Sequence, residues 1–195
     1  MTISWGAVCR AKQGQPVSGD VYLVHEYAPG MLLATVIDGL GGGEEAAHAA
    51  LLARQVLLQF PDYPLQELLR RAHTALHATR GAVIGLLRLE QAQHLALYTG
   101  VGNIGVQVYS RQPIKPISKN GILGFRLPTL LELRYAYDPG DIFVLYSDGI
   151  SGGFAQDGTI DLKQPPQRMA EQLLAGYGKL SDDATAVVIK TTERP

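Results

Sequence analysis

The chain has 195 residues, of which 46% are hydrophobic and 18% are charged, and its formal net charge at pH 7 is −1. This composition supports one domain with a sizeable core, expected to span residues 1–195, and excludes a disordered chain. The near-neutral charge indicates neither a nucleic-acid nor an anionic-membrane partner, and the single cysteine, Cys9, excludes an internal disulfide and a cysteine zinc cluster.

Three strand-like runs come first, over residues 3–11, 21–27 and 31–37. The third run is apolar throughout, which favours a central, buried strand. Cys9 lies in the first run and is expected to be a small buried hydrophobe. No segment approaches the roughly 18 apolar residues of a spanning helix, and the first residues lack the apolar run of a signal peptide. We therefore expect a soluble, cytoplasmic protein without a membrane partner.

Two helices are predicted after these strands. The first covers about 44–59, and the second begins near Asp62 and Pro64 and runs to about Thr79. The apolar residues of the second helix recur with the spacing of one helical face, at Leu65, Leu68, Leu69, Ala72 and Leu76. This helix is therefore expected to pack on a flat surface such as a sheet.

The second half of the chain is predicted to consist mostly of strands joined by short turns. The predicted strands cover 82–90, 94–101, 104–110, 131–138, 142–147 and 184–190. One more helix is predicted over 164–176, ended by Gly176 or Gly178. This order of elements indicates an α+β layered domain in which antiparallel strand pairing dominates.

Several aspartates stand at the ends of apolar strands or in glycine turns: Asp20, Asp38, Asp148, Asp182 and Asp183. Their carboxylates would repel one another in a shared cleft unless divalent cations neutralised them. Ligands that are all oxygen suit Mg²⁺ or Mn²⁺ better than zinc. An Asp-Gly pair alone is usually an ordinary turn, and 157–158, which follows no apolar strand, is interpreted as one.

The glycine-rich segment 39–43 raises the alternative of a phosphate-binding loop, because it follows a strand and opens a helix. Its spacing does not fit a dinucleotide loop, since Glu44 occupies the third glycine position, and no Gly-Lys-Ser/Thr follows. Glu44 and Glu45 would also repel a phosphate at that helix N-terminus. A nucleotide-binding regulatory domain is therefore disfavoured, and a cation held by Asp38 is favoured.

Five segments together resemble the motifs of the metal-dependent (type 2C, PPM) serine/threonine protein phosphatases. They are SGD at 18–20, VIDGLGGGEEA at 36–46, TGVGN at 99–103, YSDGI at 146–150 and SDDATAVVI at 181–189. Each motif is weak alone, but the ordered set spans nearly the whole chain. The chain is most similar to the compact SpoIIE/RsbX-like bacterial branch, and in size to its stand-alone stressosome phosphatases. The resemblance implies two stacked, mainly antiparallel β-sheets flanked by α-helices, with metals in a cleft at one edge.

Carried over by position, the resemblance also implies a ligand set for two Mn²⁺ or Mg²⁺ ions. Asp38 would bridge the two ions, and the Gly39 carbonyl would contact one of them. Asp148 and Asp182 would complete the shell of the first ion, and Asp20 would serve the second directly or through water. On this interpretation Asp38 and Asp148 are catalytic through activated water that attacks phosphorus.

The implied substrates are phosphorylated STAS-domain proteins of a stressosome-like complex. Asp183 stands where many relatives have asparagine and is expected to orient its neighbour. Asn103 stands where larger relatives have an aspartate, which leaves open whether a third metal site exists. The alternative function is a catalytically silent member of the fold that binds metal and docks a partner.

Three roles remain open at the level of sequence. Arg10 and Arg80 are both candidates for gripping the phosphate. The general acid is sought among the histidines, which are His25, His48, His73, His77 and His94. The i, i+4 pair on the second helix, His73 and His77, is interpreted as an ordinary surface pair. Segment 116–132 is either a loop that docks a protein substrate or a crossover that packs Leu123 and Phe125.

Overall fold

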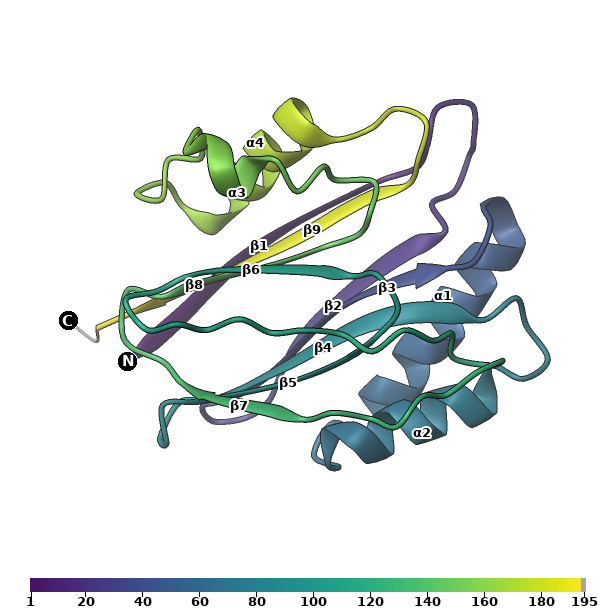
Figure 1. Cartoon of the computed structure of the whole chain (residues 1–195), viewed down its shortest axis with the longest axis horizontal. Helices are drawn as coiled ribbons and strands as arrows, with labels where there is room; N and C mark the ends of the chain where they lie inside the picture. Colours follow the sequence, from purple (N-terminus) through teal and green to yellow (C-terminus); the bar gives the residue numbers. More distant parts are fainter. Residues whose placement is uncertain (194–195) are drawn as a thin grey trace.

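Two antiparallel sheets stacked face to face form the centre of the computed structural model, which describes residues 1–193 (Figure 1). The four-stranded sheet has the order β1 (Thr2–Arg10), β9 (Ala184–Thr192), β8 (Ile142–Tyr146), β6 (Gly105–Tyr109). The five-stranded sheet has the order β2 (Asp20–Ala28), β3 (Met31–Gly39), β4 (Ala82–Glu90), β5 (Leu95–Val101), β7 (Leu133–Ala136). All pairs of neighbouring strands in these sheets are antiparallel, as expected from the short connections.

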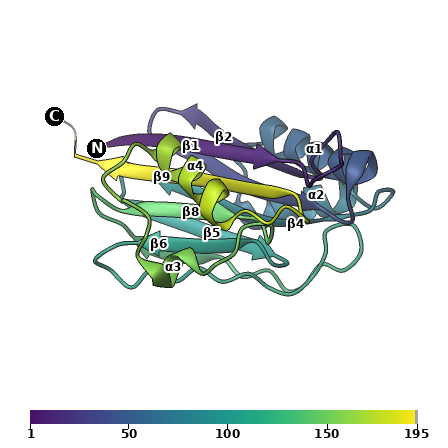
Figure 2. The ribbon, with the colours of Figure 1, turned by 90° about the horizontal axis from the view of Figure 1, so that it is seen from above.

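Helices cover the outer face of each sheet, which gives four layers (Figures 1 and 2). The helices α1 (Gly43–Gln59) and α2 (Leu65–Ala75) pack on the five-stranded sheet, and α4 (Pro166–Tyr177) packs on the four-stranded one beside the short α3 (Phe154–Asp157). The predicted fold, two stacked antiparallel sheets flanked by helices, is therefore confirmed. Among residues 1–193, no helix has both the length and the apolar character needed to cross a membrane.

Strand β3 shows why its sequence is apolar without alternation. Leu33 and Ile37 belong to the core beneath α1 and α2, while Leu32, Ala34 and Val36 face the other sheet. Both faces of the strand are therefore buried, and no position along its centre needs a polar side chain. This agrees with the prediction that the third strand is an interior one.

Three local expectations need correction. Helix α2 ends at Ala75, not Thr79, because hydrogen-bonded turns at 76–80 lead the chain back to β4. Asp157-Gly158 is the end of helix α3, which was not predicted, and Gly158 caps it in the left-handed conformation at φ 61°. Cys9 is exposed, because β1 is an edge strand.

Candidate metal centre

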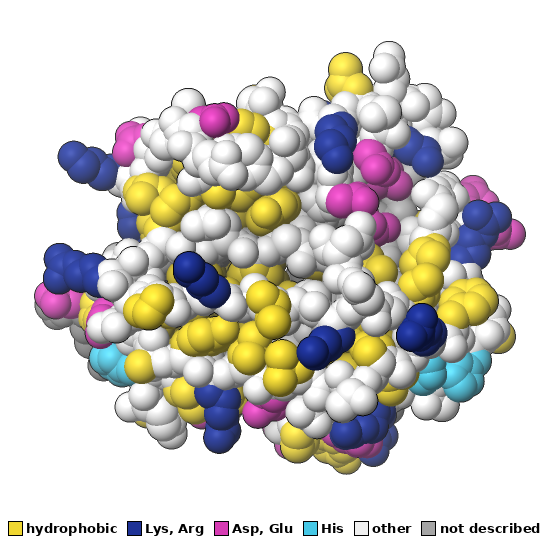
Figure 3. Space-filling view, viewed as in Figure 1, with side chains coloured by type: hydrophobic (Ala, Val, Ile, Leu, Met, Phe, Trp, Pro, Cys, Tyr) yellow, Lys and Arg dark blue, Asp and Glu magenta, His cyan; other side chains and the backbone are white. Residues whose placement is uncertain are grey.

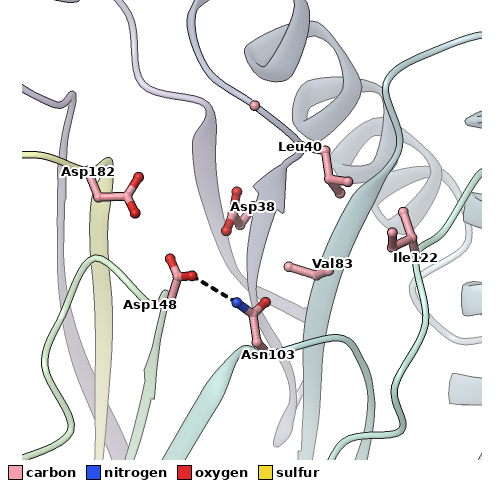
Figure 4. A pocket seen from close by; sticks show the side chains of 8 residues that line it. Asp38, Leu40, Val83, Asn103, Ile122, Asp148 and Asp182 are labelled. Atoms are coloured by element: carbon pink, nitrogen blue, oxygen red, sulfur yellow. Dashed lines mark hydrogen bonds between the residues drawn. The ribbon is translucent and has the colours of Figure 1, made fainter.

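Three of the predicted carboxylates line one cavity of about 320 Å³, at the ends of the strands that carry them (Figure 4). Asp38 comes from the end of β3, Asp148 follows β8, and Asp182 precedes β9. Figure 4 shows these side chains directed into a common space, opposite an apolar wall that includes Val83 and Ile122. The rest of the lining consists of Leu40, Gly41 and Asn103.

Strand pairing explains this convergence. Strands β8 and β9 are antiparallel neighbours, so the end of one and the start of the other lie together, which brings Asp148 beside Asp182. Strand β3 lies in the facing sheet, where Asp38 is the direct cross-strand partner of Asp20. Residues from three distant parts of the chain therefore meet at one edge of the sandwich.

Asp20 lies beneath the cavity and does not line it. Its side chain is 5% exposed, and its Oδ2 accepts a 2.6 Å hydrogen bond from the Ser147 hydroxyl. Ser147 Oγ in turn accepts a hydrogen bond from the Thr185 amide, which ties β2 to the other sheet. Burial is the main reason that the pKa of Asp20 rises to about 6.

The pKa of Asp38 rises to about 8, first because of burial and then because Asp20 and Asp148 lie close by. No Lys or Arg side chain belongs to the described lining of the cavity. Like charges directly opposite on paired strands are unfavourable, so Asp20 and Asp38 cost stability when both are ionised. Oxygen donors under such repulsion fit Mg²⁺ or Mn²⁺.

The carboxylates surround the cavity without closing on a single point. Within residues 1–193, no three His, Cys, Asp or Glu side chains are gathered closely enough to enclose one ion. The side chains of Asp38, Asp148 and Asp182 offer only oxygen donors, and such donors suit hard divalent cations that keep part of their shell as water.

Asp148 is positioned by Asn103, whose contact with Asp148 was not predicted, and by Lys179, which was not predicted to take part in the site. The Asn103 amide donates to Asp148 Oδ2 at 2.8 Å, which leaves the other carboxylate oxygen free (Figure 4). The Lys179 ammonium donates to the Asp148 backbone carbonyl at 2.6 Å. In the sequence, Asn103 follows Gly102 directly after a predicted strand, and this placement marks it as a candidate site residue. No sequence motif marks Lys179.

The two glycines that follow the site aspartates are needed for close packing. A Cβ on Gly39 would lie 2.0 Å from the Ala46 carbonyl oxygen of α1. A Cβ on Gly149 would lie 1.9 Å from the Asp183 carbonyl oxygen at the start of β9. These backbone contacts are enough to require glycine at both positions. Glycine is needed there whether or not its small size also helps a metal to approach.

Asp183 holds the β1–β2 loop in place. Its two carboxylate oxygens accept hydrogen bonds from the backbone amides of Lys12, at 2.9 Å, and Gly19, at 3.0 Å. The Asp183 amide donates to Asp182 Oδ1 at 2.9 Å. Asp183 lies outside the described cavity lining, and its hydrogen bonds suit a structural role.

The two candidate arginines differ in position. Arg10 points away from the cavity and donates to the Lys179 carbonyl at the groove beside α4. Arg80 pairs with Glu45 of α1 and lies against Gly41, which lines the cavity. Of the two, only Arg80 lies against a residue that lines the cavity.

None of the five histidines lines the cavity among the described residues. His48 borders a separate hollow with Glu44 and Arg80. His73 and His77 form more than a surface pair, because their Nε2 atoms lie 3.1 Å apart and His73 Nδ1 accepts from the Gly124 amide. This pair therefore ties α2 to segment 116–132.

Comparison with known proteins gives consistent results. The sequence profile of the family described as Stage II sporulation protein E (SpoIIE) matches residues 28–192. Phosphoserine phosphatase RsbX of Bacillus subtilis (strain 168) is 22% identical over 142 residues, which are 72% of this chain and 71% of RsbX.

Solved structures agree with this. A chain from a structure described as "The bacterial stressosome: a modular system that has been adapted to control secondary messenger signaling" superposes with a TM-score of 0.89. It is 32% identical, and the match covers 97% of this chain and 100% of that one. RsbX in complex with magnesium gives a TM-score of 0.85 at 20% identity, covering 97% and 96% of the two chains.

Proposed function

The chain belongs to the SpoIIE family of PP2C-type phosphatase domains, and we propose that it removes phosphate from phosphoserine or phosphothreonine with two Mn²⁺ or Mg²⁺ ions. The observation that carries the proposal is the convergence of Asp38, Asp148 and Asp182 on one cavity. When bound, the ions supply an activated water for in-line attack on phosphorus and neutralise the phosphoryl oxygens.

The protein's own residues hold and orient the site. Asp38 is proposed to hold both ions, the Gly39 carbonyl to contact one of them, and Asp148 and Asp182 to complete the shell of the first. Asp20, buried below, is proposed to serve the other ion directly or through water. Asn103 keeps one oxygen of Asp148 occupied and so directs the other into the cavity. The apolar wall of Val83 and Ile122 limits how much water surrounds a bound phosphate.

We further propose that the substrates are phosphorylated STAS-domain proteins of a stressosome-like complex, met in the cytoplasm by a single domain spanning residues 1–195. Support comes from the similar chain in a structure described as a bacterial stressosome and from the likeness to a phosphoserine phosphatase.

The test is hydrolysis of a phosphorylated STAS-domain protein and of p-nitrophenyl phosphate, with Mn²⁺ and with EDTA. Activity should require Mn²⁺ and should fall at least about 100-fold in Asp38→Asn and in Asp148→Asn. Asp157→Asn is the matched control, because it changes the same dipeptide on α3, outside the cavity. Calorimetric Mn²⁺ binding without any turnover would instead identify a silent, partner-docking member of the fold.

A further inference from the structure

A second hollow adjoins the carboxylate cavity and shares a wall with it. Val83, Asn103 and Ile122 line both spaces, and the second is completed on its far side by Asn120 and Arg126. If the phosphorylated side chain of a substrate enters the first space, residues that flank it would lie across Ile122 toward the second. This step rests on the function proposed above.

The segment that forms the second hollow is held rigidly. Ile122 and Arg126 form a small antiparallel turn, with the Arg126 amide donating to the Ile122 carbonyl at 2.8 Å and the Ile122 amide donating back at 3.0 Å. Leu123 is fully buried and exchanges two backbone hydrogen bonds with Ala82, next to the cavity wall. The Gly124 amide is held by His73 of α2. Arg126 is thus displayed from a fixed backbone.

Within residues 1–193, the guanidinium of Arg126 makes neither an ion pair nor a side-chain hydrogen bond, whereas that of Arg71 pairs with Glu67. An unpaired cation at the rim of a hollow is available to a negatively charged ligand.

The surrounding segment carries the same sign of charge. Residues 110–132 contain four cations and one acid, a net charge of +3; the cations are Arg111, Lys115, Lys119 and Arg126, and the acid is Glu132. This segment crosses the front of the molecule between β6 and β7 (Figure 1). On the same face, Figure 3 shows Lys and Arg side chains spaced apart over the surface, while Asp and Glu gather in a hollow at its right.

We propose that Arg126 is a specificity residue that pairs with an acidic residue flanking the phosphorylated serine or threonine of the substrate. On this proposal the carboxylate cavity binds the phosphate group, and the positively charged segment 110–132 binds the acidic residues next to it. A phosphopeptide with acidic neighbours is therefore preferred over one with basic neighbours, because only the acidic flank finds a counter-charge in the second hollow.

The experiment compares three phosphoserine peptides that differ only in acidic, neutral or basic flanks, on the wild type and on Arg126→Glu. The wild type should favour the acidic peptide, and Arg126→Glu should lower kcat/KM for it about fivefold, the equivalent of roughly 1 kcal/mol. The same variant should raise kcat/KM for the basic peptide. Arg111→Glu makes the same charge change in the same segment, outside both hollows, and should leave the preference unchanged.

Mn²⁺-dependent hydrolysis of p-nitrophenyl phosphate, which has no flanks, separates this inference from the proposed function. Its rate should be the same in the wild type and in Arg126→Glu. If the wild type does not hydrolyse it, the proposed function itself fails. If p-nitrophenyl phosphate is hydrolysed but none of the three peptides is, both dephosphorylation of phosphoserine and the role of Arg126 fail. Peptide turnover with no flank preference, an equal shift in Arg111→Glu, or a parallel loss of p-nitrophenyl phosphate hydrolysis in Arg126→Glu would overturn only the role of Arg126.

Discussion

At the scale of single residues, the opposition of Asp20 and Asp38 on paired strands is the main electrostatic feature. The pKa of Asp38 rises from 3.8 to about 8 in the folded protein. A carboxyl with a raised folded pKa contributes stability at acid pH, and that contribution is lost as the pH rises through the folded pKa. Without metal, Asp38 therefore makes the fold less stable as the pH rises from about 4 to about 8.

The first prediction is that, in EDTA, Asp38→Asn is more stable than the wild type at pH 8 and that this difference shrinks toward pH 5. The amide cannot ionise, so it removes the cost of burying a charged carboxylate and also the repulsion from Asp20 and Asp148. Urea unfolding at several pH values measures it, with Asp157→Asn as the control. An advantage of Asp38→Asn that stayed constant across the pH range would show that ionisation of Asp38 is not its cause.

Glycine at position 39 is required by a backbone contact and not by backbone flexibility. We predict that Gly39→Ala lowers the free energy of unfolding by about 1–3 kcal/mol, because the new Cβ would lie 2.0 Å from the Ala46 carbonyl oxygen. Gly176→Ala in α4 is the control, since a Cβ there meets nothing within 4 Å and alanine favours helix. Denaturant unfolding compares them, and equal stabilities would show that α1 shifts easily.

At the scale of elements, the contact between α2 and the 122–126 turn depends on the neutral ring of His73. Its Nδ1 accepts the Gly124 amide at 3.0 Å, so Nε2 carries the proton and donates to His77 Nε2. Burial and His77 both lower the pKa of His73, which agrees with a ring that stays neutral as an acceptor.

We therefore predict that His73→Ala speeds hydrogen exchange of the Gly124 amide about fivefold or more, the factor expected for loss of a hydrogen bond worth about 1 kcal/mol. His77→Ala keeps the Gly124 bond and serves as the matched control. Exchange measured by NMR or mass spectrometry over 120–127 distinguishes them. Equal exchange in both variants would mean that Leu123 alone holds the turn.

Strand β1 illustrates how an exposed sheet edge is covered. The Gln167 side chain of α4 accepts from the Ala7 amide and donates to the Ala7 carbonyl, in place of a further strand. Pairing the free edge with a side-chain amide in this way hinders edge-to-edge association. The same edge position explains why Cys9 is exposed despite its apolar neighbours.

At the scale of the whole molecule, the lining of the carboxylate cavity comes from both sheets, so a cation bound there would stabilise the folded state. We predict that Mn²⁺ at 100 times its Kd adds about 2.7 kcal/mol of stability and raises Tm by about 5–10 °C. Asp38→Asn should lose most of that shift, and Asp157→Asn should keep it. Thermal scans across Mn²⁺ concentrations give the measurement, and equal shifts in both variants would place the ion elsewhere.

The sequence by itself determined the order and type of most elements and the aspartates that meet at the cavity. Hydrophobic periodicity is local, so the apolar β3 and the one-sided α2 could be predicted from neighbouring residues alone. Asp38 and Asp148 were found because an aspartate ending a buried strand is visible within a few residues.

Only the tertiary structure decided the surroundings of those side chains, because partners distant in sequence set them. Asp20 is buried under the cavity because Ser147 and Thr185 lie against it from the other sheet. Arg126 lines the hollow next to the carboxylate cavity because its turn is hydrogen-bonded to Ala82 and His73, which are far away in the chain. Burial, hydrogen bonding and neighbouring charge depend on such contacts, and no local pattern records them.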